Sequence, residues 1–135
     1  MNDRQKDLCK YRISQSKDSL EVAEMALERG LFKDSINRSY YAAFYAVKAV
    51  LALEVVDFKR HKDVMAYFNK TYVATERFPR ELGRKLGKLQ QLREKSDYDD
   101  FYLASREVAE IQVKSAKMVM EEIIKFIQCV GVGDL

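Results

Sequence analysis

Apolar residues occur on nearly every side of the predicted helix between Ser35 and Leu51. Small and large side chains follow steps of three and four residues in two parallel strips: Ser39, Ala42, Ala46 and Ala49, and then Ile36, Tyr40, Ala43, Val47 and Leu51. A third face mixes aromatic and polar groups: Asn37, Tyr41, Phe44, Tyr45 and Lys48. A helix with almost no polar face has to be buried, so the pattern predicts a central core helix. The mixed face leaves open a second interpretation, in which its aromatic rings line a groove.

Helical periodicity extends over most of the chain. It predicts one helix over residues 5–29, which Gly30 closes, and the core helix, which begins after Leu31 and runs to about residue 54. A short helix follows at residues 62–74, and a fourth begins at Pro79 and ends at a polar break over residues 96–100. A long final helix begins at about residue 103 and ends before Gly131. We therefore predict an all-α, up-and-down bundle of about five helices, four long and one short, as a single domain over residues 1–135.

Composition agrees with this class of fold. Only one proline and five glycines occur in 135 residues, too few for the many turns of a β-sandwich or an α/β fold. No uncharged apolar run reaches the roughly eighteen residues that a membrane span needs, and the first residues are polar, so we expect a cytoplasmic protein. Cys9 and Cys129 lack the spacing of a zinc motif. We expect no metal centre and no bound cofactor.

Positive charge is concentrated in the middle of the chain. Residues 59–95 contain eleven lysine and arginine residues and four acidic residues, whereas residues 96–135 contain four and eight. On the predicted fourth helix one face carries a basic stripe: Arg80, Arg84, Lys88 and Lys95. This stripe could attract an anion, or it could be a solvated face balanced by the acidic final helix.

Arg93 is the most unusual residue of the fourth helix. It lies eleven residues after Leu82, which brings an α-helix back to nearly the same side, so a guanidinium is placed in line with a leucine face. A cation in that position needs an anionic partner; the candidates are Asp97 and the acidic cluster Asp99–Asp100, and Tyr98 can add a hydroxyl. Either Arg93 and Asp97 tie this helix to the core helix, or Arg93 holds a phosphate in a groove.

Two segments of the chain resemble a known family. The run from Asn37 to Ala46, NRSYYAAFYA, followed by the run from Arg93 to Tyr98, REKSDY, resembles the HEPN domain, a small helical bundle. The likeness covers nearly the whole chain in the same order of helices. It implies a homodimer of the small prokaryotic type, which is often encoded beside a minimal nucleotidyltransferase as a toxin–antitoxin module or a nucleotide-handling complex.

The resemblance also bears on catalysis. Many HEPN proteins that cleave RNA without metal carry an arginine followed, after four to six residues, by a histidine that moves a proton. Here Tyr98 or an aspartate takes the histidine's place, and the only histidine, His61, has no arginine at that spacing. We therefore lean against an enzyme. His61 at the start of a helix is either structural or catalytic, and the catalytic candidates are Arg93, Asp97, Tyr98 and His61.

The function predicted from the sequence is a helical partner of a nucleotidyltransferase that binds nucleotide or RNA phosphate in a groove. The expected ligand-binding residues are Asn37, Arg38, Tyr41, Arg93, Asp97 and Tyr98. Two alternatives remain open, a metal-independent endoribonuclease toxin and a non-catalytic structural module.

Overall fold

The computed structural model describes residues 1–135 and contains only helices and their connections. The elements are α1 (Asp3–Glu28), α2 (Phe32–Ala52), α3 (His61–Phe68), the π-helix η1 (Asn69–Val73), α4 (Arg80–Tyr98) and α5 (Arg106–Cys129). The prediction of an all-α bundle of five helices, one of them short, is confirmed.

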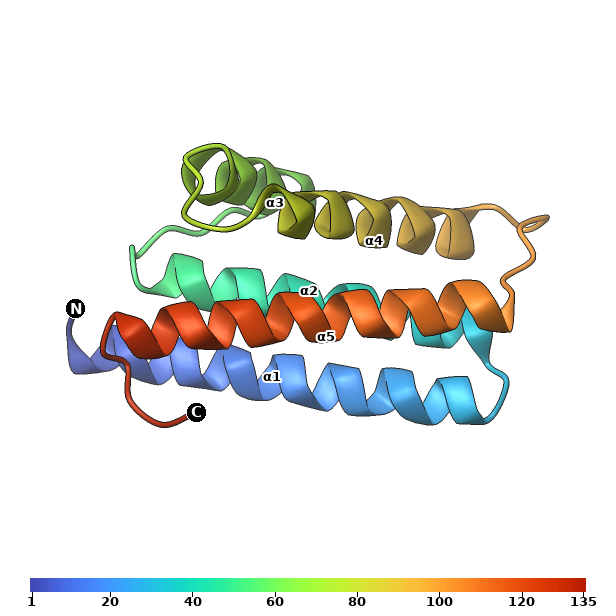
Figure 1. The fold of residues 1–135 in the computed structure, drawn as a ribbon, viewed down its shortest axis with the longest axis horizontal. Helices are drawn as coiled ribbons and strands as arrows, with labels where there is room; N and C mark the ends of the chain where they lie inside the picture. Colours follow the sequence, from blue (N-terminus) through green and yellow to red (C-terminus); the bar gives the residue numbers. More distant parts are fainter.

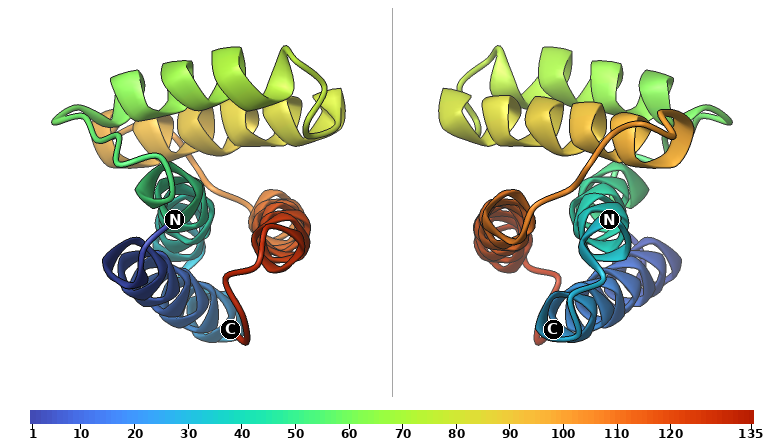
Figure 2. Two further views of the ribbon diagram at one scale, coloured as in Figure 1. Left: turned by 90° about the vertical axis from the view of Figure 1, so that its left-hand side faces the viewer. Right: turned by 90° about the vertical axis from the view of Figure 1, so that its right-hand side faces the viewer.

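The helices form two layers. Helices α1, α2 and α5 run side by side, whereas α3, η1 and α4 form a second layer that lies across them on the α2 side (Figures 1 and 2). Helix α2 contacts α1, α3, α4 and α5, which makes it the centre of the bundle. None of the helices combines the length and the apolar character that crossing a membrane requires.

The prediction that α2 is a core helix is confirmed by its burial. The strip of small residues is fully buried, and so is the parallel strip: Ser39, Ala42, Ala46 and Ala49, and Ile36, Tyr40, Ala43, Val47 and Leu51. Two buried hydroxyls link α1 to α2 by hydrogen bonds. Ser16 donates to the carbonyl of Ala42 at 2.5 Å, and Ser35 donates to the carbonyl of Ala23 at 2.9 Å. Each satisfies a polar group that would otherwise be costly to bury.

The predicted ends of α4 and α5 are wrong by a few residues. Helix α4 continues through the expected break to Tyr98, because Asp97 forms an ion pair with Arg93 one turn earlier, at 3.1 Å. Helix α5 begins at Arg106, three residues later than expected, because Ser105 caps it by accepting a hydrogen bond from the Val108 N–H at 3.1 Å.

The predicted third helix is two elements. Residues 61–68 are α-helical, and Asn69–Val73 then form a π-helical turn whose wider spacing the sequence pattern does not reveal. Facing this turn, Gly83 of α4 approaches so closely that an added Cβ would lie 2.8 Å from Cγ1 of Val73. The π-helical turn and a glycine thus fix how α4 packs on η1.

Candidate functional site

Arg93 projects from the apolar side of α4 onto two tyrosines of α2. Its side chain is 17% exposed, and its Cζ atom lies 5.2 Å from the ring centre of Tyr40 and 5.5 Å from that of Tyr41. Nη2 donates to the Tyr41 hydroxyl at 3.1 Å, and Nε lies 3.1 Å from the Asp97 carboxylate. The guanidinium is therefore held on one side by π faces and on another by a carboxylate.

Asp97 connects α4 to α2. Besides facing Arg93, its two carboxylate oxygens accept hydrogen bonds from Nδ2 of Asn37 at 3.1 and 3.3 Å. Four of the six predicted ligand-binding residues, Asn37, Tyr41, Arg93 and Asp97, thus form one network.

The other two predicted residues lie outside this network. Tyr98 is 76% exposed at the end of α4, at the edge of the cleft that Arg93 lines. Arg38 is exposed on the other side of α2, in a separate shallow hollow with Asp34 and Met25. The structure therefore does not bring Arg38 to the other five residues, because Arg38 follows Asn37 by one position and so points to a different face of the helix.

An open cleft of about 850 Å³ lies between the start of α3 and the second half of α4. Five lysine and arginine residues line it, against two carboxylates: Lys59, Arg60, Lys62, Arg93 and Lys95, against Glu94 and Asp99. His61, Tyr98, Gln90 and Gln91 complete the lining. The concentration of basic residues after position 58 was visible in the sequence, and so was the acidic cluster that includes Asp99, whereas Gln90, Gln91 and Glu94 carry no pattern that could have singled them out.

His61 reaches the same place from the first position of α3. Its ring centre lies 4.1 Å from that of Phe44, and Nδ1 lies 3.3 Å from the hydroxyl of Tyr40, the tyrosine that also carries Arg93. Burial lowers the pKa of His61, and the positive charges of Arg93 and Lys48 lower it further. The imidazole is consequently neutral at pH 7.

Tyr40 shares a hydrogen bond with His61. It is fully buried, and burial raises the pKa of its phenol well above the usual value. The phenol therefore stays protonated and can donate or accept in this contact; in the His61 tautomer whose Nδ1–H donates to the Tyr40 oxygen, Nε2 of the neutral ring carries no proton. Two side chains that are 32 positions apart in sequence, His61 and Arg93, are thereby placed against one tyrosine ring.

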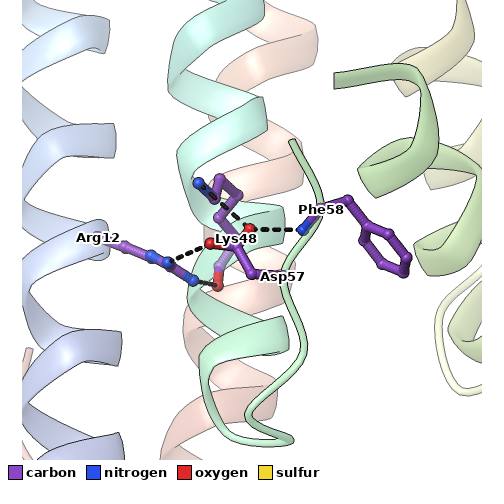
Figure 3. Close-up of polar contacts among 4 residues, drawn as sticks. All are labelled: Arg12, Lys48, Asp57 and Phe58. Atoms are coloured by element: carbon purple, nitrogen blue, oxygen red, sulfur yellow. Dashed lines mark hydrogen bonds and ion pairs between the residues drawn. The ribbon is translucent and has the colours of Figure 1, made fainter. Parts of the chain in front are cut away.

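The connection that leads into α3 is fastened by a small ionic cluster (Figure 3). Arg12 of α1, whose side chain is 11% exposed, donates to the carbonyl of Lys48 at 2.9 Å and lies 3.4 Å from the Asp57 carboxylate. Lys48 lies 3.6 Å from the same carboxylate, which also accepts from the N–H of Phe58 at 2.8 Å. Asp57 thus anchors the loop that precedes His61.

Metal-ligating side chains do not gather in the structure. No group of three or more histidine, cysteine, aspartate or glutamate residues is placed to hold a metal ion. Both cysteines are free, Cys9 being buried and Cys129 exposed.

Comparison with known proteins places this arrangement in a family. A model of the HEPN domain matches residues 9–127. The chain is 28% identical over 128 residues to a UPF0332 protein of Thermotoga maritima, covering 95% of this chain and 96% of the relative. It is 32% identical over 114 residues to "Putative toxin MJ0605" of Methanocaldococcus jannaschii, covering 84% of each chain. It is 26% identical over 115 residues to "Putative toxin MJ0142" of the same organism, covering 85% of this chain and 78% of the relative. On the match to residues 9–127, this chain belongs to the HEPN domain family.

Proposed function

We propose that this chain is a toxin-type HEPN protein that binds the phosphate groups of RNA, or of a nucleotide, in the cleft beside Arg93. The observation that carries the proposal is the position of Arg93, which is held by Tyr40, Tyr41 and Asp97 at the wall of a cleft rich in positive charge. A guanidinium fixed in this way loses little freedom when it binds a ligand.

The geometry of Arg93 leaves part of its hydrogen-bonding capacity unused. Nη2 donates to the Tyr41 hydroxyl, and Nε faces the Asp97 carboxylate. The two protons of Nη1 are therefore available to another acceptor. Phosphate oxygens suit a guanidinium, and the neighbouring side chains of Lys59, Lys62 and Lys95 add the charge that holds a polyanion.

The partners proposed for the protein follow from its family. Two relatives carry the word toxin in their names, and the resemblance to small prokaryotic HEPN proteins supports a homodimer and a nucleotidyltransferase partner. Light scattering of the purified chain tests the homodimer. Co-purification with the nucleotidyltransferase encoded next to its gene tests the partner, and a monomer or the absence of such a complex would refute the corresponding part.

A second candidate function, cleavage of RNA, is favoured by the location of His61. The spacing in the sequence argues against a paired arginine and histidine, yet both residues lie on Tyr40 and line the same cleft. In the tautomer that donates Nδ1–H to Tyr40, Nε2 of the neutral imidazole can accept the proton of a ribose 2′-hydroxyl while Arg93 stabilises the negative charge that develops on the phosphate.

Binding is tested with a fluorescein-labelled single-stranded RNA and the variant Arg93→Gln, followed by fluorescence anisotropy. Arg77→Gln is the matched control, because Arg77 also lies over two aromatic rings, 4.7 Å from Tyr72 and 5.1 Å from Phe126, but outside the cleft. We expect Arg93→Gln to weaken binding about tenfold or more and Arg77→Gln to leave it unchanged. Equal affinities for the wild type and Arg93→Gln, with both proteins folded by circular dichroism, would refute the proposal.

Cleavage is tested separately with the same RNA in the presence of EDTA. We expect products that end in a 2′,3′-cyclic phosphate, and their loss in His61→Gln without a loss of RNA affinity. RNA that stays intact while it binds to the wild type would refute cleavage and leave the binding function in place.

A further inference from the structure

The exposed face of α4 continues the cleft as a basic ridge. Arg80, Arg84, Lys88 and Lys95 follow one another at steps of four and seven residues, so they lie on one side of the helix, and all four are exposed. Lys95 lines the cleft itself, so the ridge leads into it. Along the helix axis the distance from Arg80 to Lys95 is about 22 Å, which is longer than a single nucleotide.

The charges of the ridge are largely uncompensated. Only Arg80 has a carboxylate near it, Glu76 at 4.0 Å, and Arg84, Lys88 and Lys95 form no ion pair. In contrast, Lys85, which lies off the ridge, is paired with Glu81 at 3.6 Å. Unpaired surface charges of one sign are available to a polyanion.

Gly87 supplies an independent observation on the same face. It lies inside α4 between Arg84 and Lys88, and an added Cβ would meet no atom within 4 Å. A glycine in a helix interior costs about 1 kcal/mol relative to alanine, and no packing contact explains it here. A bare stretch of backbone between two cations lets an extended ligand lie close to the helix.

The true end of α4 adds an aromatic ring to the ridge. Because the helix continues to Tyr98, three residues after Lys95, this side chain lies at the end of the basic face and is 76% exposed where it lines the cleft. An exposed ring beside a phosphate-binding surface is suited to stack on a nucleobase.

We propose that this face of α4, the basic ridge with Gly87 and Tyr98, is a track along which single-stranded RNA enters the cleft. The inference rests on the proposed function and specifies it, because a track of this length makes a strand of several nucleotides the ligand and a mononucleotide insufficient. Phosphates lie along Arg80, Arg84 and Lys88, a base stacks on Tyr98, and the next phosphate reaches Arg93.

The experiment compares a labelled oligouridylate of about ten nucleotides with a labelled dinucleotide, by anisotropy at several salt concentrations. Replacing Arg80, Arg84 and Lys88 together by glutamine should weaken binding of the longer strand about tenfold and reduce the slope of log affinity against log salt by about 2, since each phosphate contact on a single strand contributes about 0.7. Affinity for the dinucleotide should not change.

Gly87→Glu tests the track without removing any contact. It should weaken binding of the longer strand, whereas Ser14→Glu, which makes the same change of charge on the exposed side of α1 in the other layer, should not. Light scattering of Gly87→Glu shows whether this face instead holds a second copy of the chain. A change in oligomeric state with RNA affinity unaltered would overturn the track.

The outcomes separate the two proposals. If the longer strand binds in a manner that depends on Arg93 but the ridge variants bind as well as the wild type, the track is refuted and the cleft stands. If no RNA binds, or if Arg93→Gln binds normally, the proposed function itself fails.

Discussion

Two glycines of α4, four positions apart, should respond to alanine in opposite directions. At Gly87 the new methyl group meets open space, so only the helix propensity changes. Gly87→Ala should raise the free energy of unfolding by about 1 kcal/mol, which corresponds to an increase in Tm of about 3–5 °C for a chain of this size.

At Gly83 the methyl group would lie 2.8 Å from Cγ1 of Val73, on the π-helical turn. Valine is stiff about χ1, so it cannot turn away cheaply. Overpacking of this kind costs about 1–3 kcal/mol, which equals or exceeds the gain in helix propensity of about 1 kcal/mol. Gly83→Ala should therefore be destabilised by up to about 2 kcal/mol, and it should lie about 1–3 kcal/mol below Gly87→Ala.

Urea denaturation followed by circular dichroism measures both variants under identical conditions. The double variant Gly83→Ala with Val73→Ala removes the clash, so a double-mutant cycle should give a favourable coupling of about 1 kcal/mol or more. If Gly83→Ala and Gly87→Ala stabilise the protein equally, or if the coupling is zero, then α4 does not approach η1 as described here.

Further measurements test the site and the residues that support it. The NMR signal of His61, the only histidine, should titrate with a pKa below 6.5, and Arg93→Gln should raise this pKa because a neighbouring positive charge is removed. The folded state binds this proton less tightly than the unfolded state. The contribution of neutral His61 to the free energy of unfolding should therefore be fully present above about pH 6.5 and be lost as the pH drops through the pKa of the folded protein. His61→Gln should remove this pH dependence from the urea midpoint. Asp57→Ala should cost about 1 kcal/mol in urea denaturation and leave the Cys9 alkylation rate of the native state unchanged. Burial raises the pKa of the Cys9 thiol to about 11, so mass spectrometry should show iodoacetamide labelling Cys129 before Cys9, and the reverse order would contradict the packing of α1.

The helices were predictable because their signals are local. The small residues of α2 at steps of three and four, the scarcity of proline and glycine, and Gly30 after the first helix all act over a few residues. The ends of α4 and α5 were misjudged because they depend on side-chain bonds, the Arg93–Asp97 pair and the Ser105 cap, that outweigh local composition.

The candidate site was predictable only in part. The pairing of Arg93 with Asp97 follows from their spacing on one helix, whereas the prediction of Arg38 as a ligand-binding residue overlooked that adjacent helical positions point to different faces. The approach of His61 to Arg93 could not be read from the chain, because it depends on how α3 and α4 both pack on α2. In the folded chain both residues contact Tyr40, although they lack the arginine-to-histidine spacing in sequence.

Tyr40 and Tyr41 fix the relative position of two side chains from different helices. The imidazole of His61 and the guanidinium of Arg93 both lie beside these two rings, so their separation is set by α2, a helix to which neither residue belongs. Altering the volume of the packed residues beneath the two rings would lift or lower both groups at once. Core substitutions beneath these rings should therefore also change the geometry of the cleft surface.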